Sequence, residues 1–327
     1  MRVVDMHCDT LSVLLRRERE GQEVSLRQND CMVSLEKMRR GDYGLQTFAA
    51  FIYAPEAENP LEEALSQIDL FERQMEENED WIRPVRSYRE IEETWDQGLM
   101  CALLSVEEGG ACKGNPAFLR TLYRLGVRMM TLTWNFENEL AYPNQSRREH
   151  PHGVVPEEAR GLKEKGIEII EEMERIGMIV DVSHLSDKGF WEVYEHAKKP
   201  FIASHSNARS VCPHPRNLTD EMIRALAERG GVAGLNYCAA FLDSDGTGTH
   251  AGRLEEMSAH VRHLIKVGGE DLVGLGSDYD GISKTPDMGG CDGIQKLAAR
   301  LHKDGLTAGQ IEKVFYGNVL RVFRELL

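Results

Sequence analysis

The sequence has no cysteine framework and no long apolar run. Its seven cysteines are an odd number at irregular spacings, and no CxxC pair occurs. Scattered thiols of this kind are typical of a reducing compartment. No stretch reaches the roughly 18 apolar residues of a membrane span, and the first residues, MRVVDMH, lack the apolar region of a signal peptide. We therefore expect a cytoplasmic protein that is not inserted in a membrane.

The sequence is also short of positive charge. It carries 39 Lys and Arg against 54 Asp and Glu, a formal net charge of -15, and its basic residues form no long block. Such a surface repels a phosphate backbone, so we expect no nucleic-acid partner.

Three common catalytic motifs are missing from the sequence. It contains no GxSxG, no GxxxxGK[ST] and no HExxH. The first is the nucleophile elbow of serine hydrolases, the second is the phosphate-binding loop of nucleotide hydrolases, and the third is the zinc-binding helix of many metalloproteases. Any catalytic activity must therefore depend on residues outside these three motifs.

Short β-prone apolar runs alternate with longer amphipathic segments along the 327 residues. Nearly continuous apolar character is typical of strands that are buried on both faces of a parallel sheet. Eight such units predict an α/β fold, a (β/α)8 or TIM barrel of the metal-dependent hydrolase type, with a doubly wound open sheet as the alternative. The eight runs are Val3 to Asp9, Leu45 to Ile52, Cys101 to Glu107, Met129 to Trp134, Ile179 to His184, Phe201 to Ser206, Val232 to Tyr237 and Val273 to Asp278.

The segments between these runs predict helices. No linker rich in Pro, Gly or Ser divides the chain, so we expect residues 1–327 to form one barrel domain. The polar stretch from Asn135 to Pro156 follows the fourth run and predicts a long active-site loop. Clear helical examples are Leu61 to Asn78, Gly161 to Ile176, Asp220 to Glu228 and Arg253 to Lys266.

Five of the eight predicted strands end in residues that bind metals or move protons. In a barrel of this kind, the carboxyl ends of all strands meet at one rim. This convergence carries more weight than any single residue, because each side chain alone has an ordinary structural explanation. The residues are His7 and Asp9 on the first strand, Glu107 on the third, His184 on the fifth, His205 on the sixth and Asp278 on the eighth.

The spacing of His7 and Asp9 allows both to reach one ion, because residues two apart on a strand point to the same face. Cys8, between them, should point to the opposite face and pack in the core. His184 and His205 end consecutive predicted strands and could share a second ion. Neutral imidazole is the commonest zinc ligand.

Glu107 has two oxygens and could bridge two ions, although Glu108 is a rival for that role. Asp278 lies in the segment GSDYDG with Asp280, and the pair could supply a ligand and a general base. A mixed nitrogen and oxygen set with few ligands per ion leaves room for water, as in catalytic zinc sites. Two ions about 3.5–4 Å apart could share a hydroxide and polarise a carbonyl group.

These residues resemble the pattern of the membrane (renal-type) dipeptidase family, the M19 metallopeptidases. The resemblance covers nearly the whole chain through DMHCDT, SVEEGG, IVDVSHLS, ASHSNARSVCPHPRN, GLGSDYDG and YGNVLRVF. It implies a binuclear zinc barrel that hydrolyses dipeptides. On this resemblance, His7, Asp9 and Glu107 hold one zinc and Glu107 bridges to the other.

The resemblance also implies roles for the remaining residues. His184 and His205 hold the second zinc, and Asp278 transfers a proton from the bridging water to the leaving amine. Arg216, in the segment HPRN, matches the arginine that holds the substrate carboxylate. The planar guanidinium fork suits that task.

The sequence departs from the family pattern at two places. Trp134 stands where animal members have a histidine that contacts the substrate carbonyl, and Asn135 or Asn138 could take over its role. Glu108 replaces a glycine of the usual Glu-Gly-Gly. The secretion signal and the lipid-anchor tail of animal members have no counterpart here. The resemblance further implies a homodimer and a tolerance for dipeptides with a C-terminal D-residue.

The leading hypothesis is therefore a zinc-dependent dipeptidase that acts through a metal-bound hydroxide. One alternative is another binuclear-metal barrel hydrolase, acting on a small cyclic amide, lactone or phosphoester. A second is a barrel of weak activity that serves as a binding protein. Manganese or iron could replace zinc, because imidazole and carboxylate ligands suit several metals.

Overall fold

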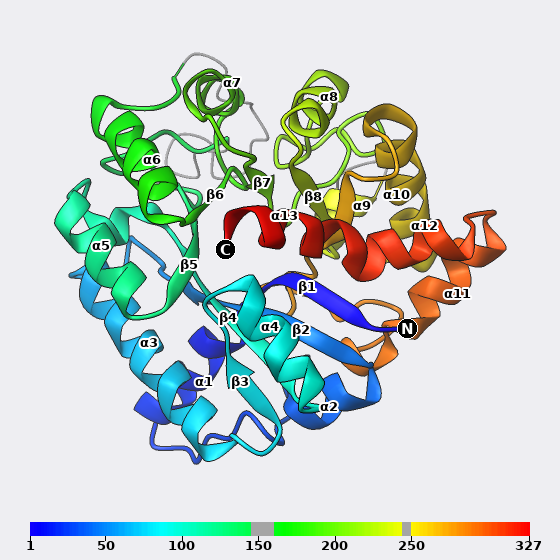
Figure 1. Ribbon diagram of the computed structural model, residues 1–327, viewed down its shortest axis with the longest axis horizontal. Coiled ribbons are helices and arrows are strands. Elements are labelled where there is room, and N and C mark those ends of the chain that lie inside the picture. Colours follow the sequence, from blue (N-terminus) through cyan, green and yellow to red (C-terminus); the bar gives the residue numbers. More distant parts are fainter. Residues whose placement is uncertain (145–159, 244–249) are drawn as a thin grey trace.

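Eight parallel strands close into a ring, with helices packed around it (Figure 1). The computed structural model describes residues 1–144, 160–243 and 250–327. The ring confirms the predicted barrel, and each predicted run corresponds to one of its strands. Those strands are β1 (Val3–Cys8), β2 (Tyr43–Phe51), β4 (Met100–Glu107), β5 (Val127–Thr131), β6 (Ile179–Asp181), β7 (Ile202–Ala203), β8 (Val232–Leu235) and β9 (Val273–Leu275).

The pairing of β2 with β4 completes the ring. Its register runs from Leu45 opposite Cys101 to Phe51 opposite Glu107, and all neighbouring strands of the ring pair in parallel. This pairing excludes the open doubly wound sheet. A short ninth strand, β3 (Ile82–Pro84), pairs only with the beginning of β4 and lies outside the ring.

Several strands end earlier than the apolar runs predicted. β6 ends at Asp181 and β9 at Leu275, so His184 and Asp278 both lie in the turns that follow. Their φ angles are 69° and 61°, in the left-handed region that few non-glycine residues adopt. His205 likewise lies two residues beyond the end of β7. The prediction that these side chains sit on strand ends was therefore wrong by three residues for His184 and Asp278 and by two for His205, although all three remain at the carboxyl rim.

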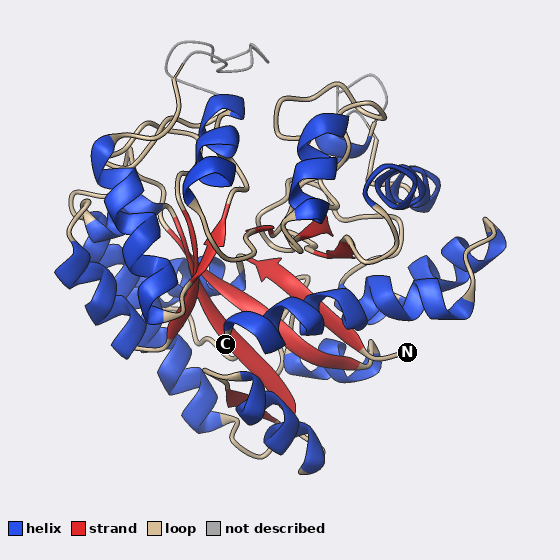
Figure 2. Cartoon of the chain, turned by 45° about the horizontal axis from the view of Figure 1, so that its top comes forward, coloured by secondary structure: helices blue, strands red, loops and turns tan. Residues whose placement is uncertain are grey.

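The helices cover the outside of the ring, where Figure 2 shows them around the central strands. Three of the four example helices shift by one to three residues at an end, and α8 has the predicted bounds. Thr219 caps α8 by accepting from Met222 N, and Gly177, at φ 83°, ends α6. The larger helices are α1 (Thr10–Arg19), α3 (Pro60–Glu77), α4 (Tyr88–Asp96), α5 (Pro116–Arg124), α6 (Glu164–Ile176), α7 (Asp187–His196), α8 (Asp220–Glu228), α10 (Leu254–Gly268), α11 (Gln295–Lys303) and α13 (Asn318–Leu326).

Shorter helical pieces join these elements. A π-helical turn, η3, connects α12 to α13, so that the three run on into one another across the ring in Figure 1. The pieces are α2 (Leu35–Arg40), η1 (Gly109–Cys112), α9 (Ala239–Leu242), η2 (Cys291–Gly293), α12 (Ala308–Glu312) and η3 (Lys313–Gly317).

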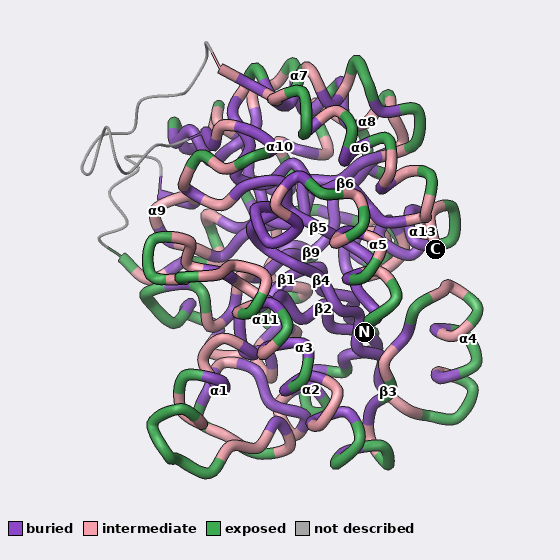
Figure 3. Tube along the Cα trace, turned by 90° about the vertical axis from the view of Figure 1, so that its left-hand side faces the viewer, coloured by how far each residue is buried: buried purple, intermediate pink, exposed green. Residues whose placement is uncertain are grey.

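Helix α13 closes one end of the barrel. Val319 and Phe323 are buried in the same apolar cluster as Val4, Leu103 and Ile202, which come from the inner faces of three strands. Buried backbone fills the centre of the molecule in Figure 3, and exposed segments lie at its periphery. Apolar packing therefore closes the amino end of the barrel, and the predicted metal-binding side chains lie at the carboxyl end.

Two further predictions concern membrane-spanning helices and the long loop after the fourth run. No helix among the described residues is long and apolar enough to cross a membrane. The predicted loop from Asn135 to Pro156 is described as far as Asn144, and its residues 145–156 lie outside the described part of the chain.

Candidate metal centre

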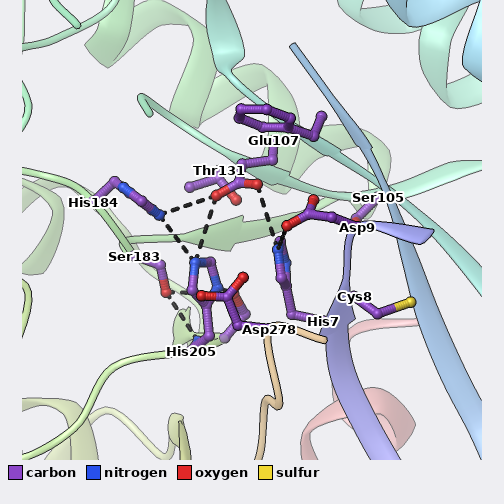
Figure 4. Close-up of polar contacts among 12 residues, drawn as sticks. His7, Cys8, Asp9, Ser105, Glu107, Thr131, Ser183, His184, His205 and Asp278 are labelled. Carbon is purple, nitrogen blue, oxygen red and sulfur yellow. Dashed lines mark hydrogen bonds and ion pairs between the residues drawn. The ribbon is translucent and has the colours of Figure 1, made fainter. Parts of the chain in front are cut away.

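A local irregularity in β1 orients His7. Val4 and Met6 point into the barrel, so regular alternation would turn His7 outward and Cys8 inward. The pairing with β2 shifts register between Asp5 and Cys8, however. His7 consequently faces the other metal-binding candidates, and Cys8 packs in the outer core with its sulfur pointing away from them (Figure 4).

Glu107 is the meeting point of three histidines. Its Oε2 lies 3.4 Å from His7 Nε2, and its Oε1 lies 3.0 Å from His184 Nε2 and 3.5 Å from His205 Nε2. The two imidazole nitrogens of His184 and His205 are 3.0 Å apart. Asp9 Oδ2 lies 3.7 Å from His7 Nε2. The structure thus brings all five predicted ligands together around one carboxylate (Figure 4).

Glu108 faces away from this cluster. Its carboxylate accepts hydrogen bonds from Gly110 N (2.8 Å), from Trp134 N (2.9 Å) and from the amide of Asn138. These partners lie in η1 and in the segment after β5, beside the rim. Of the two neighbouring glutamates, only Glu107 has the position of a bridging ligand.

Two of the histidines are oriented by further polar side chains. His184 Nδ1 bonds Asn135 Oδ1 at 2.8 Å, which leaves Nε2 to face Glu107. Ser204 Oγ donates to the buried carboxylate of Asp181 and accepts from His205 Nδ1 at 2.7 Å. Such partners fix the tautomer and the ring orientation of a metal-binding histidine.

Asp278 stands at the opposite side of the same cluster. Its Oδ2 accepts a hydrogen bond from Asn236 Nδ2 at 2.9 Å, and its backbone N–H donates to His7 O. The aspartates leave little room at this point, because a Cβ at Gly281 would lie 1.9 Å from Asp9 Oδ2 and 2.5 Å from Asp278 Oδ1. Glycine at 281 therefore permits both carboxylates to face the cluster.

The donor set fits a divalent metal. The buried atoms His7 Nδ1, His7 Nε2 and Asp9 Oδ1 have no hydrogen-bond partner among the described residues, and buried polar atoms of this kind need one. Two groups of side chains place their ligand atoms within 4.8 Å of one another: His7, Glu107 and His205, and His7, Asp9 and Asp278. A cation between them would give the side chains of His7 and Asp9 a partner and offset the buried negative charge.

The protonation states of the predicted ligands differ from one residue to the next. Burial lowers the pKa of His184 to about 3, and the charge of Arg216 adds to this effect. Burial disfavours the charged form of Glu107, yet the charge of His7 and the histidine contacts outweigh it and hold the pKa of Glu107 well below its ordinary value. Burial, with the charge of Glu107, raises the pKa of Asp9 to about 8. Burial opposes the charged form of His7, but the charges of Glu107 and Asp9 outweigh it and raise the pKa of His7 well above its ordinary value. His184 and Glu107 therefore have the protonation states that a metal binds, whereas His7 and Asp9 would each release a proton when a metal binds.

A cleft of about 380 Å³ opens onto the cluster. This volume is in the range of small-molecule sites. Trp134 and Asn135, two of the predicted substrate contacts, line the cleft. It is lined by Asp9, Glu107, His184 and Asp278, and also by Ser12, Val13, Arg16, Phe51, Tyr53, Cys238, Phe241 and the segment 280–283.

Arg216, the third predicted substrate contact, is buried beside the cluster rather than on the wall of the cleft. Its terminal nitrogens donate to Ser206 Oγ and His205 O, each at 3.2 Å. Its Nε atom has no partner among the described residues. The guanidinium carbon lies 5.3 Å from the ring centre of Phe241, which does line the cleft.

The residues that support the ligands were not predicted from the sequence. Asp181 and Ser204 orient His205, and Asn236 orients Asp278. The buried carboxylate of Asp5 accepts from the backbone N–H groups of His7 and Ser277 and so joins β1 to the loop after β9. Asp5 and Asp181 did have a signal in the sequence, because each is a charged residue within an otherwise apolar run.

Comparisons with known proteins agree with this geometry. The family model described as membrane dipeptidase (peptidase family M19) matches residues 1–326. An uncharacterized dipeptidase of Schizosaccharomyces pombe is 32% identical over 346 residues, which covers 99% of this chain and 80% of that protein. The crystal structure of a metallo peptidase from Rhodobacter sphaeroides, liganded with a phosphinate mimic of L-Ala-D-Ala, has a TM-score of 0.91 at 25% identity and covers 100% and 99% of the two chains. That of dipeptidase AC, a metallo peptidase of family M19, has a TM-score of 0.90 at 26% identity and covers 100% and 98%.

Proposed function

The chain belongs to the membrane dipeptidase family, peptidase family M19, and from this premise we propose that it is a zinc enzyme that cleaves the peptide bond of dipeptides. Membership in the family makes it a metallo-dipeptidase, which favours this activity over hydrolysis of a cyclic amide, a lactone or a phosphoester and over a binding role. The identity of the metal, the number of ions and the residue roles belong to the proposal.

Two zinc ions per chain would be held by the cluster around Glu107. His7, Asp9 and Glu107 would hold one, and Glu107, His184 and His205 the other. When bound, zinc polarises a carbonyl group and lowers the pKa of water toward about 7. The residues do not discriminate zinc from manganese by ligand type, so the metal must be measured.

The remaining residues would bind the dipeptide and move the proton. Water adds its oxygen to the carbonyl carbon, the C–N bond breaks, and the leaving nitrogen gains a proton. Asp278, fixed by Asn236, would take that proton from water and deliver it to the nitrogen. Arg216 would attract the substrate carboxylate.

The two rim residues after β5 would complete the substrate site. Asn135 Oδ1 is engaged by His184, so the Nδ2 group is the part of that side chain that could contact the carbonyl oxygen. Trp134 would contact a substrate side chain across the cleft.

One observation carries the proposal: the Nε2 atoms of three histidines lie within 3.0 to 3.5 Å of the two oxygens of Glu107. The test is elemental analysis of the purified protein together with a dipeptide panel, before and after chelation and after zinc is restored. We expect two metals per chain and hydrolysis that is lost on chelation and regained with zinc. Hydrolysis indifferent to metal would refute the proposal.

A C-terminal D-residue is the natural extension of the panel. The related metallo peptidase from Rhodobacter sphaeroides binds a mimic of L-Ala-D-Ala, and we propose that this chain accepts the same stereochemistry. Comparable kcat/KM values for L-Ala-D-Ala and L-Ala-L-Ala would support this proposal, and failure to cleave L-Ala-D-Ala would refute it.

Three further expectations are part of the proposal. We propose a homodimer, residues 1–327 acting as one barrel domain, and a cytoplasmic location. The seven cysteines form no disulfide bond, which agrees with a reducing compartment. Light scattering measures the oligomeric state, limited proteolysis tests for a second domain, and fractionation of cells tests the location.

A further inference from the structure

Four aromatic rings gather at one corner of the cleft. The ring of Trp134 lies 5.1 Å from Phe51, 5.5 Å from Tyr53 and 5.8 Å from Phe136 between ring centres, and Tyr53 lies 5.9 Å from Phe136. Three of the four pairs meet edge to face, a geometry that aromatic rings prefer. We call this set of four residues the aromatic wall.

The aromatic wall belongs to the cleft as well as to the packing of the rim. All four residues are only partly buried, whereas the rings that pack the core, such as Phe48 and Phe71, are fully buried. Phe51, Tyr53 and Trp134 line the same cleft as Glu107 and His184. The Trp134 ring centre is 6.1 Å from that of His184, so the wall adjoins the metal ligands directly.

Glu108 ties Trp134 into this position. Its Oε2 accepts the backbone N–H of Trp134 at 2.9 Å, and its Oε1 binds Gly110 N and the amide of Asn138. Asn138 in turn donates to Leu132 O and accepts from Leu140 N. A single buried carboxylate therefore joins the turn after β4 to both sides of the turn after β5.

Glu108 holds this position at a conformational cost. Its φ is 100°, in a region that favours glycine, and such a conformation persists only where surrounding contacts over-determine it. A glycine would adopt this backbone without strain but would have no side chain to bind Trp134. The hydrogen bonds of Glu108 are the contacts that compensate.

We propose that Glu108 is a positioning residue for Trp134, and that the aromatic wall is a subsite for a large apolar side chain, aromatic above all, on one residue of the dipeptide. This proposal rests on the dipeptidase activity proposed above and names the substrate class of the same site. A substrate ring placed on the wall would gain edge-to-face or offset contacts with Trp134 and Tyr53. Alanine in the same place would leave these rings facing water.

The expected size of the preference follows from aromatic pair energies. A ring pair contributes about 0.5–1.5 kcal/mol beyond its buried area, so the loss of one partner corresponds to roughly a threefold to tenfold change in kcat/KM. The aromatic wall occupies one corner of the cleft, so it can contact only one of the two side chains of a dipeptide. The gain in kcat/KM should therefore be larger for an aromatic ring at one end of the dipeptide than for a ring at the other end.

The test compares kcat/KM for Ala-Ala, Phe-Ala and Ala-Phe in the zinc-loaded enzyme and in variants at two positions. Wild type should prefer one of the two aromatic dipeptides over Ala-Ala. Trp134→Ala should lower this preference roughly threefold to tenfold, and Trp134→Phe should retain part of it. The matched control is Trp191→Ala on α7, because Trp191 is exposed and packs on Phe190 and Tyr194. This variant should show the same aromatic preference as wild type.

Variants of Glu108 separate positioning from a general structural role. Glu108→Ala should lower the aromatic preference in the same direction as Trp134→Ala while two metals per chain are retained, and Glu108→Gln, which keeps an acceptor oxygen, should restore much of it. A metal-replete Glu108→Ala protein that keeps the aromatic preference of wild type would overturn the positioning role. Circular dichroism and thermal unfolding of each variant identify a protein that has failed to fold, in which case Trp134→Phe and Glu108→Gln decide.

The outcomes distinguish this proposal from the one on which it rests. If wild type cleaves no dipeptide with zinc bound, the proposed function fails. If wild type cleaves dipeptides with no aromatic preference, or if Trp134→Ala leaves the preference unchanged, only the subsite proposal is overturned.

Discussion

Single side chains in the candidate metal centre depend on neighbours that are not themselves predicted metal ligands. Asp278 adopts a left-handed backbone at φ 61° and receives a hydrogen bond from Asn236. His205 depends on Ser204, and His184 on Asn135. Substitutions at this scale should therefore separate loss of chemistry from loss of metal.

Asp278→Asn should remove turnover and leave the metal in place. The amide keeps the size of the side chain but cannot take up a proton, and general acid–base catalysis contributes roughly 10²–10⁴-fold. The measurement is kcat on a dipeptide, with metal content determined by elemental analysis. Turnover near that of wild type in a metal-replete Asp278→Asn protein would contradict the proton-transfer role.

Ser204→Ala should weaken the metal centre. The change removes the hydroxyl that bonds His205 Nδ1, and loss of such a supporting partner typically costs roughly 10–100-fold in metal affinity. Competition with a chromophoric chelator measures the affinity. Ser66→Ala is the control, because Ser66 Oγ bonds only the backbone of α3 at an exposed position, and it should leave the metal affinity unchanged.

At the scale of elements, helix α13 is part of the barrel core rather than an appendage. Its buried residues complete the apolar cluster inside the ring, and β1, β8 and β9 contact it.

Helix α10 is joined to the loop after β7 by the buried side chain of His260. His260 Nδ1 accepts a hydrogen bond from Ala208 N at 3.1 Å.

Phe323→Ala should destabilise the protein by about 3–5 kcal/mol, the usual cost of removing a fully buried aromatic ring. Phe323 is 0% exposed. The free energy of unfolding from urea titrations measures the effect. Leu125→Ala, at an exposed position, should change stability by less than about 0.5 kcal/mol. Equal effects of the two substitutions would contradict the role assigned to α13.

His260 should make stability fall in acid. Burial lowers its pKa to about 4, against about 6.5 in the unfolded chain. The unfolded state therefore binds the proton first as the pH falls below about 6.5, and folding loses roughly 3 kcal/mol from this residue by about pH 4. His260→Gln should flatten the dependence of the unfolding free energy on pH over that window. The exposed His196→Gln should leave the dependence as in wild type, and an equal slope in all three proteins would contradict the assignment.

At the scale of the whole molecule, the candidate metal centre joins distant parts of the chain. Its ligands come from β1, β4 and the turns after β6 and β7, so an ion held by them connects residues 7 to 205 across the barrel. Ligands that bind only the folded state stabilise it by mass action.

Chelation should therefore lower the thermal stability of the barrel, and zinc should restore it. A free metal concentration of about 100 times Kd stabilises a single site by about 2.7 kcal/mol. Differential scanning calorimetry in chelator, in buffer and with added zinc measures Tm. A Tm unaffected by chelator, in protein shown to have lost its metal, would contradict a site formed only in the folded state.

The barrel could be predicted from the sequence because buried parallel strands need nearly continuous apolar runs, and every ring strand has one. His7, Asp9, Glu107, His184, His205 and Asp278 could be identified for a related reason: each follows such a run at its carboxyl end. The order of the motifs added the family resemblance. These features are local, so a single sequence carries them.

Tertiary structure alone decided how those residues face one another. The register shift in β1 turns His7 toward Glu107, and the left-handed turns after β6 and β9 place His184 and Asp278 beyond the strands on which they were expected. Glu107 and Glu108 are adjacent in sequence but face different partners, because the backbone at Glu108 has a positive φ of 100°. Contacts between segments far apart in the chain give Asp181, Asn236 and the aromatic wall their roles. Such contacts depend on packing geometry, which residue type and spacing do not specify.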